Sequence, residues 1–110
     1  MENFKEKKEQ WYQDKIINWI KQTYPDAYLF KAIGGPYGNR NGTPDIIACI
    51  EGSFVAIEVK RPGGKATPLQ LSAIDKIKQA GGKAGVAVTV DDAKRIVEGE
   101  SGDGEQRDAG

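Results

Sequence analysis

The sequence predicts a single α/β domain with a mixed central β-sheet flanked by helices, in the order α-β-β-β-α-β-α. Three observations lead to this prediction. The chain of 110 residues has room for one modest core. Two segments repeat apolar residues at helical spacing, and four short apolar runs lie between glycine-rich and proline-rich breaks. We expect the domain to span residues 1–98 and residues 99–110 to be an acidic, disordered tail, because that tail has no apolar side chain larger than alanine.

The boundaries of the elements follow from periodicity and from the residues that interrupt it. Helices are expected over residues 5–23 and from Thr67 or Pro68 to about 80, with a final helical turn or two over 91–98. Pro25 ends the first helix, because the residue before a proline avoids the helical conformation, and a glycine pair at 81–82 ends the second. The expected strands are 27–33, 45–50, 53–60 and 85–90, and 34–44 is expected to be a loop.

Several side chains are expected in the core. The single cysteine, Cys49, lies in the apolar run IIACI and is expected to be buried; one cysteine also excludes a cysteine-rich zinc site. Trp11, Trp19 and Phe54 are interpreted as core residues because of their helical or strand spacing. No apolar run approaches the roughly 20 residues that span a bilayer, so we expect a soluble cytoplasmic protein without a membrane partner.

The composition limits the chemistry that the chain can perform. It has no histidine, which excludes Ser-His-Asp triads, histidine general bases and imidazole-rich metal sites. Hydrolytic chemistry would have to come from carboxylates, lysine and a hard metal ion. The formal net charge of zero does not by itself argue for a nucleic-acid partner.

The expected hairpin brings two acids together. If Glu51 and Gly52 form a two-residue turn, the register places Asp45 directly opposite Glu58, and strand alternation puts Lys60 on the same face as Glu58. Opposed like charges destabilise a sheet, whereas a magnesium ion between two carboxylates removes that penalty. Taken alone, Pro-Asp is a common turn opening, and Glu-x-Lys is more typical of a solvated, charge-paired strand face. Their combination favours a metal-dependent hydrolytic site.

This part of the chain resembles a known family. The segment GTPDIIACIEGSFVAIEVKRPGGKATPLQ is similar to the VRR-NUC nucleases, a branch of the PD-(D/E)xK superfamily, and the resemblance extends over residues 6–90. Asp45 matches the acid of the Pro-Asp motif, and Glu58 and Lys60 match the ExK pair. Gln70 matches a glutamine that follows Ser/Thr-Pro-Leu. Glu9 matches the first-helix glutamate, with Gln13 four residues later and Glu6 and Gln10 as close competitors.

The resemblance implies a restriction-endonuclease-like core and a metal-dependent DNA endonuclease. Mg²⁺, which Mn²⁺ may replace, would be the only cofactor, and no organic cofactor is expected. The implied metal ligands are Glu9, Asp45, Glu58 and the Val59 carbonyl. Lys60 would position or activate the attacking water, and Gln70 would orient the lysine or a metal-bound water.

The implied partners are DNA and a second copy of the chain. Stand-alone members of the family resemble Holliday-junction resolvases, which implies a homodimer that cuts branched DNA such as four-way junctions or flaps. The host would be a bacterial or phage-infected cell. Two alternatives stay open: a catalytically silent nucleic-acid-binding module on the same fold, and a metal phosphohydrolase for a small substrate. The residues expected to contact DNA are Lys31, Tyr37, Asn39, Arg40, Asn41, Arg61 and Lys65.

Overall fold

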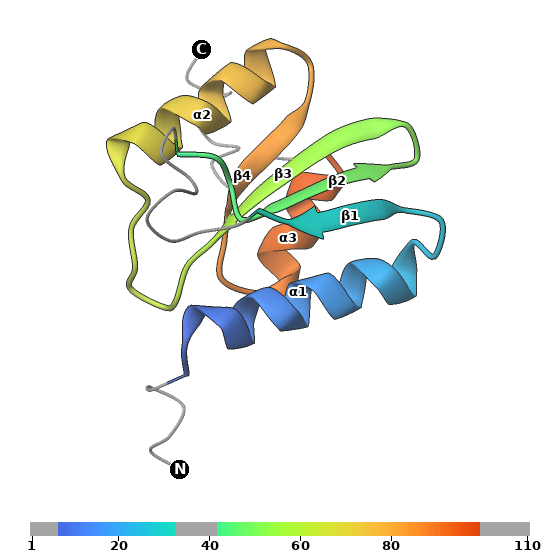
Figure 1. The fold of residues 1–110 in the computed structure, drawn as a ribbon, viewed down its shortest axis with the longest axis horizontal. Coiled ribbons are helices and arrows are strands. Elements are labelled where there is room, and N and C mark those ends of the chain that lie inside the picture. Colours follow the sequence, from blue (N-terminus) through green and yellow to red (C-terminus); the bar gives the residue numbers. More distant parts are fainter. Residues whose placement is uncertain (1–6, 33–41, 100–110) are drawn as a thin grey trace.

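The computed structural model describes residues 7–32 and 42–99. This part of the chain folds into a four-stranded mixed sheet with a layer of helices on each face (Figure 1). The observed order is α1-β1-β2-β3-α2-β4-α3, which confirms the predicted α/β fold class and the predicted order of elements. None of the helices in the described ranges is long and apolar enough to cross a membrane.

The helices and strands lie close to their predicted positions. Their bounds are α1 Glu9–Thr23, β1 Tyr28–Lys31, β2 Ile46–Ile50, β3 Ser53–Val59, α2 Pro68–Gln79, β4 Lys83–Ala87 and α3 Val90–Val97. Two elements differ most: α1 starts at Glu9 and not at residue 5, and β4 was predicted at 85–90. A capping box ends the strand early: the Thr89 hydroxyl accepts the Asp92 N–H, and the Asp92 carboxylate accepts the Thr89 N–H. This pair starts α3 at Val90, so Val88 and Thr89 form the turn between the two elements.

The register of the sheet agrees with the predicted hairpin. The strand order is β1-β2-β3-β4, with antiparallel pairing among the first three strands and parallel pairing of β3 with β4. The β2–β3 turn is Glu51-Gly52, and both residues have positive φ, 51° and 85°. Two such residues are typical of the type I′ turn that suits a two-residue hairpin loop. Ile46 is paired with Ile57, so one further step along the ladder sets Asp45 opposite Glu58.

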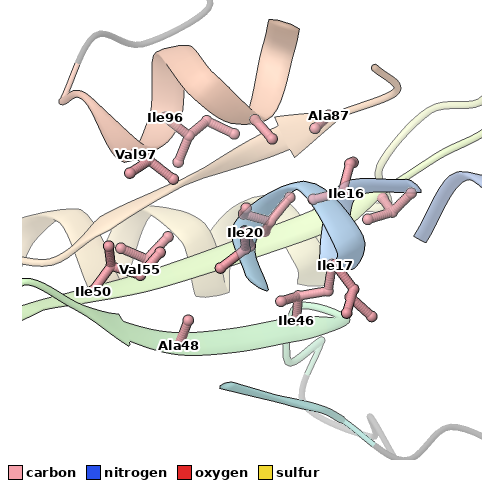
Figure 2. Close-up of a cluster of buried hydrophobic side chains, with 13 residues drawn as sticks. Ile16, Ile17, Ile20, Ile46, Ala48, Ile50, Val55, Ala87, Ile96 and Val97 are labelled. Carbon is pink, nitrogen blue, oxygen red and sulfur yellow. The ribbon is translucent and has the colours of Figure 1, made fainter. Parts of the chain in front are cut away.

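The main core lies between one face of the sheet and the helices α1 and α3. Figure 2 shows isoleucine side chains of α1 meeting apolar side chains of β2, β3 and α3. A smaller cluster on the opposite face packs α2 against β3 and β4. The central strand β3 is therefore covered on both faces, and every residue from Val55 to Val59 is buried. The buried members of the main core are Ile16, Ile17, Ile20, Ile46, Ala48, Ile50, Val55, Ile57, Val59, Ala87, Ala93, Ile96 and Val97.

Three of the side chains predicted to be buried are exposed. Cys49 is exposed, and Phe54 retains 48% of its surface in solvent. Both lie on the face that α2 shares, but α2 packs mainly over β3 and β4, and no described helix covers the β1–β2 side of this face. Trp11 is 39% exposed, because the helical repeat that buries Ile16 turns Trp11 outward. Trp19 packs against the main core as predicted.

Candidate active site

Asp45 is held between two neighbouring strands at one end of the sheet. It stands immediately before β2, where its backbone carbonyl accepts the Ala32 N–H over 2.7 Å. Its side chain reaches β3, where Oδ2 accepts the Val59 N–H over 2.9 Å. The carboxylate thus accepts a backbone donor at the point where the β2–β3 ladder ends. These two bonds fix both the position of Asp45 and the direction of its side chain.

Glu58 is a buried acid whose carboxylate is only partly satisfied by neighbouring groups. Only 1% of the residue is exposed, and its Oε1 atom has no hydrogen-bond partner. Its Oε2 atom lies 3.4 Å from the Lys60 ammonium group. The pKa of Glu58 is raised from its ordinary value of 4.5 to about 7: burial is the largest cause, the charge of Asp45 adds to the rise, and Lys60 offsets part of it. A buried acid that is so costly to ionise is typical of a functional site.

Lys60 connects the acids with the first helix. Its backbone N–H donates to the Ala87 carbonyl over 2.9 Å, which anchors the residue to β4 just beyond the end of β3. Its side chain is 13% exposed, and the ammonium nitrogen lies 4.0 Å from Glu9 Oε2 as well as near Glu58. Glu9 is the first residue of α1, and its charge also raises the pKa of Glu58. Of the competing first-helix residues, the structure thus describes Glu9 near the site, and Glu6 lies outside the described residues.

The start of α2 lies beside the segment that leads into β2. Gly42 has a φ of +79°, and a β-carbon there would come within 2.5 Å of the Leu69 carbonyl oxygen. Only glycine permits this close approach. Gln70 lies in the same turn, where its Oε1 accepts the Thr67 N–H over 2.8 Å in a capping box. Its described side-chain bond thus stabilises the helix, and its proposed role toward the lysine stays a prediction.

Two features of the site bear on whether a divalent cation fits it. The residues that the structure describes contain no group of three or more Asp, Glu, Cys or His side chains arranged to hold a metal ion. The acids Glu9, Asp45 and Glu58 are therefore not gathered into a complete three-acid site. Glu58 nevertheless offers a buried carboxylate oxygen without a partner, next to a second carboxylate whose charge opposes its ionisation. A hard cation that takes oxygen ligands would satisfy that atom and remove the repulsion, so the residues present fit one.

The predicted DNA contacts are resolved in part. Lys31 ends β1 and is exposed, one residue before the Ala32 N–H that binds Asp45. Arg61 and Lys65 are exposed in the segment that follows Lys60. Arg61 directly follows Lys60, whereas Lys31 is paired with Ile46, so strand alternation puts Lys31 on the face opposite Asp45 and Glu58. The remaining predicted contacts, Tyr37, Asn39, Arg40 and Asn41, lie outside the described residues.

Sequence reasoning missed two residues that build the site. The Val59 amide, which binds Asp45, was considered only for its carbonyl group. The prediction of a loop over 34–44 gives Gly42 no separate role, although it packs against the first turn of α2. The Gly-Thr-Pro-Asp sequence carries a weak signal for such a contact, because a glycine so close to a strand marks a close backbone approach.

Comparisons with known proteins place the chain in a family. Residues 7–91 match the model of the VRR-NUC domain. A solved VRR_NUC domain has a TM-score of 0.58 and 18% identity, over 80% of this chain and 96% of that one. A VRR_NUC domain protein has a TM-score of 0.61 and 23% identity, over 89% of this chain and 94% of that one.

A third solved structure is Hjc, a Holliday junction resolvase from Archaeoglobus fulgidus, with a TM-score of 0.55 and 17% identity over 73% of this chain and 67% of that one. At these identities the solved structures show a shared fold. No curated protein matches the chain. Since the family model covers most of the described domain, the chain belongs to the VRR-NUC domain family, a family of nucleases.

Proposed function

We propose that this protein is a metal-dependent DNA endonuclease that hydrolyses phosphodiester bonds in branched DNA. The observation that carries the proposal is the buried Glu58 carboxylate beside Asp45 and Lys60, whose Oε1 atom has no hydrogen-bond partner. A protein that only bound phosphate would be better served by cations than by two neighbouring acids. The VRR-NUC domain match adds independent support for nuclease chemistry.

The residues of the site would have separate roles in metal binding and in catalysis. Asp45 and Glu58 would hold Mg²⁺ or Mn²⁺, with Glu9 and the Val59 carbonyl as further ligands. When bound, such an ion supplies Lewis-acid polarisation of the scissile phosphate and neutralises charge on the leaving oxygen. Lys60 keeps its ammonium group next to the acids, where it can orient a water molecule and stabilise charge that develops on the phosphoryl oxygens.

Glu58 must lose its proton before it can act as a ligand. Its raised pKa of about 7 means that a substantial fraction is protonated at neutral pH. Ligands compete with protons, so the affinity for the cation should rise with pH until Glu58 is ionised. Lys60 assists this change, because its positive charge favours the ionised carboxylate.

The proposed substrate is branched DNA, and the proposed assembly is a homodimer. Two lines of support bear on this: the resemblance to stand-alone family members, and the fold shared with a protein described as a Holliday junction resolvase. A four-way junction has two equivalent scissile strands, so a two-fold dimer would present one site to each. Arg61, Lys65 and Lys31 would contact the backbone near the cut.

Cleavage assays test the proposal directly. Purified protein is incubated with end-labelled four-way junction, flap, single-stranded and linear duplex DNA, in Mg²⁺, Mn²⁺ or EDTA. Glu58→Gln and Lys60→Ala run beside the wild type, and Lys94→Ala is the control because Lys94 is an exposed lysine on α3. We expect metal-dependent cutting that the two site variants lose by at least about 100-fold, within the range of one electrostatic catalytic group, and that the control retains.

Two results would overturn the proposal. Cutting that persists in Glu58→Gln would remove this site from the chemistry. A folded wild type that binds DNA yet cuts none of the substrates would indicate the silent binding module. Sedimentation at micromolar protein, with and without junction DNA, tests the homodimer separately, and a strictly monomeric protein would contradict it.

A further inference from the structure

Among the described residues, helices cover one face of the sheet over only part of its width. The helix α2 packs on β3 and β4, and no other described helix packs on this face. No described helix packs on the part formed by β1, β2 and the start of β3. Figure 1 shows α2 displaced to the β4 side of the sheet, away from β1.

The strand register arranges this part of the face in rows that lead to the acids. Tyr28, Cys49 and Phe54 are neighbours across β1, β2 and β3. The next row on the same face starts with Phe30, which is paired with Ile47. The row after that contains the acids Asp45 and Glu58. Successive rows on one face are two residues apart, or about 7 Å.

The rows present aromatic rings to solvent. Tyr28 is 72% exposed and Phe30 is 49% exposed, and their ring centroids lie 6.4 Å apart with a 64° angle between the planes. Phe54 is nearly half exposed, and Cys49 is exposed between them. We call the set Tyr28, Phe30, Ile47, Cys49 and Phe54 the aromatic face.

A groove continues the aromatic face toward the catalytic end. It has a volume of about 360 Å³ and lies between β2 and α2. This volume falls within the roughly 300–1,000 Å³ of ligand-binding sites. Its walls include Pro44, which directly precedes Asp45, together with Ile47, Phe54, Leu69 and Lys76. Lys76 gives this apolar groove a cationic rim.

We propose that the aromatic face binds unpaired bases of the DNA substrate next to the bond that is cut. This inference rests on the proposed function and identifies the part of a branched substrate that the protein recognises. Exposed aromatic side chains on a sheet stack with bases of any sequence, because every base has a π-face. The spacing of the rows puts Phe30 one step from the acids and Tyr28 two steps from them, so a strand whose phosphate lies at Asp45 can place neighbouring bases on the rings.

The alternative occupant is a second copy of the chain. The continuity of the rows with Asp45 argues against it, because a protein seated on Phe30 would crowd the approach of DNA to the acids. The cation on the groove rim also suits a phosphate better than a second apolar face. The homodimer proposed above would then use a different surface.

The single cysteine provides a probe of this face in the unmodified protein. Cys49 is exposed in the middle of the aromatic face, so its alkylation by iodoacetamide reports what covers it. The rate is measured in EDTA, with a saturating single-stranded oligonucleotide or with the blunt duplex of the same sequence. We expect the single strand to slow alkylation at least about tenfold and the duplex to leave it within about twofold. Equal protection by the duplex, or no protection at all, would overturn the inference.

Variants test the rings individually, and all are checked for an unchanged melting temperature. Tyr28→Ala and Phe30→Ala are each expected to weaken binding of the single strand in EDTA by about 5- to 150-fold, the usual effect of one lost base-stacking contact. Binding of the duplex should stay within about twofold. Trp11→Ala is the matched control, because Trp11 is a comparably exposed aromatic residue on the outer face of α1, and it should change neither affinity.

The same experiments separate the possible failures. Protection of Cys49 that grows with protein concentration, in the absence of DNA, would assign the face to a contact between copies and refute the inference. Cleavage by the wild type without protection by the single strand would refute the inference and leave the nuclease proposal intact. Protection without cleavage would support the inference and refute the nuclease proposal.

Discussion

Replacing Glu58 by glutamine is expected to stabilise the metal-free protein while abolishing its activity. The folded protein holds the pKa of Glu58 at about 7, against an ordinary value of 4.5. At about 1.4 kcal/mol per unit, ionising this buried group costs about 3 kcal/mol of folding free energy. Glutamine has the same shape and no charge, so the variant avoids this cost.

The direction of the Glu58 pKa shift determines the pH range in which the variant is more stable than the wild type. Below the ordinary value of 4.5, Glu58 is protonated in both the folded and the unfolded chain and resembles glutamine. As the pH rises toward 7, the unfolded chain ionises first, and the wild type loses stability relative to the variant. Above pH 7 the whole difference of about 3 kcal/mol is present, which corresponds to a rise in melting temperature of roughly 15 °C for a domain of this size.

Urea unfolding in EDTA at pH 4 and pH 8 measures the two free energies. We expect the wild type and Glu58→Gln to agree at pH 4, and the variant to be more stable by about 2–3 kcal/mol at pH 8. Adding Mg²⁺ at pH 8 should raise the stability of the wild type and leave the variant unchanged, because binding to the folded state alone stabilises it. A variant that is less stable than the wild type at pH 8 in EDTA would refute the reasoning.

Three further predictions concern contacts with the backbone, two at the site and one at the start of α3, each measured by urea unfolding at pH 7. Gly42→Ala should lose about 2–3 kcal/mol, because its β-carbon meets a carbonyl oxygen of α2 at 2.5 Å. Gly52→Ala, with a similar φ and open space, should lose only about 1 kcal/mol, and equal losses would contradict the role of the close approach. Asp45→Ala should cost about 1–3 kcal/mol by leaving the Val59 N–H without an acceptor, whereas Asp45→Asn should retain most of that bond; equal losses would exclude the contact. Thr89→Ala should cost about 1 kcal/mol by removing the α3 cap, Thr89→Ser should restore it, and a Thr89→Ala protein as stable as the wild type would show that the cap contributes little.

The arrangement of the acids at the end of the sheet was predictable because it depends on the local geometry of the hairpin. A two-residue turn fixes the register of its hairpin, so the pairing that sets Asp45 opposite Glu58 follows from the Glu51-Gly52 position alone. The position of Lys60 on the same face as Glu58 follows from strand alternation. The Thr89–Asp92 capping box is also present in the sequence as Thr-x-x-Asp, and this pattern indicates that β4 ends before Thr89.

The errors came from tertiary placement. Cys49 lies in an apolar run and would be buried if a helix covered β2 on that face. Nothing in the local sequence indicates that α2 packs over β3 and β4 instead, so the exposure of Cys49 and Phe54 could not be deduced from it. Trp11 and its neighbour Tyr12 are separated by a rotation of about 100° about the helix axis, and apolar spacing alone does not fix which of the two faces the core.

Because the Val59 amide donates a hydrogen bond to the Asp45 carboxylate, the environment of this amide in the central strand depends on the position of the Asp45 side chain. Any partner that turns the Asp45 side chain changes the acceptor of this one amide proton. In an NMR spectrum, the Val59 amide signal should therefore move when the acid engages a cation or a phosphate-bound water. Its exchange with solvent deuterium should change at the same time, while amides in the middle of β3 stay constant. Occupancy of the site can thus be followed without a substrate.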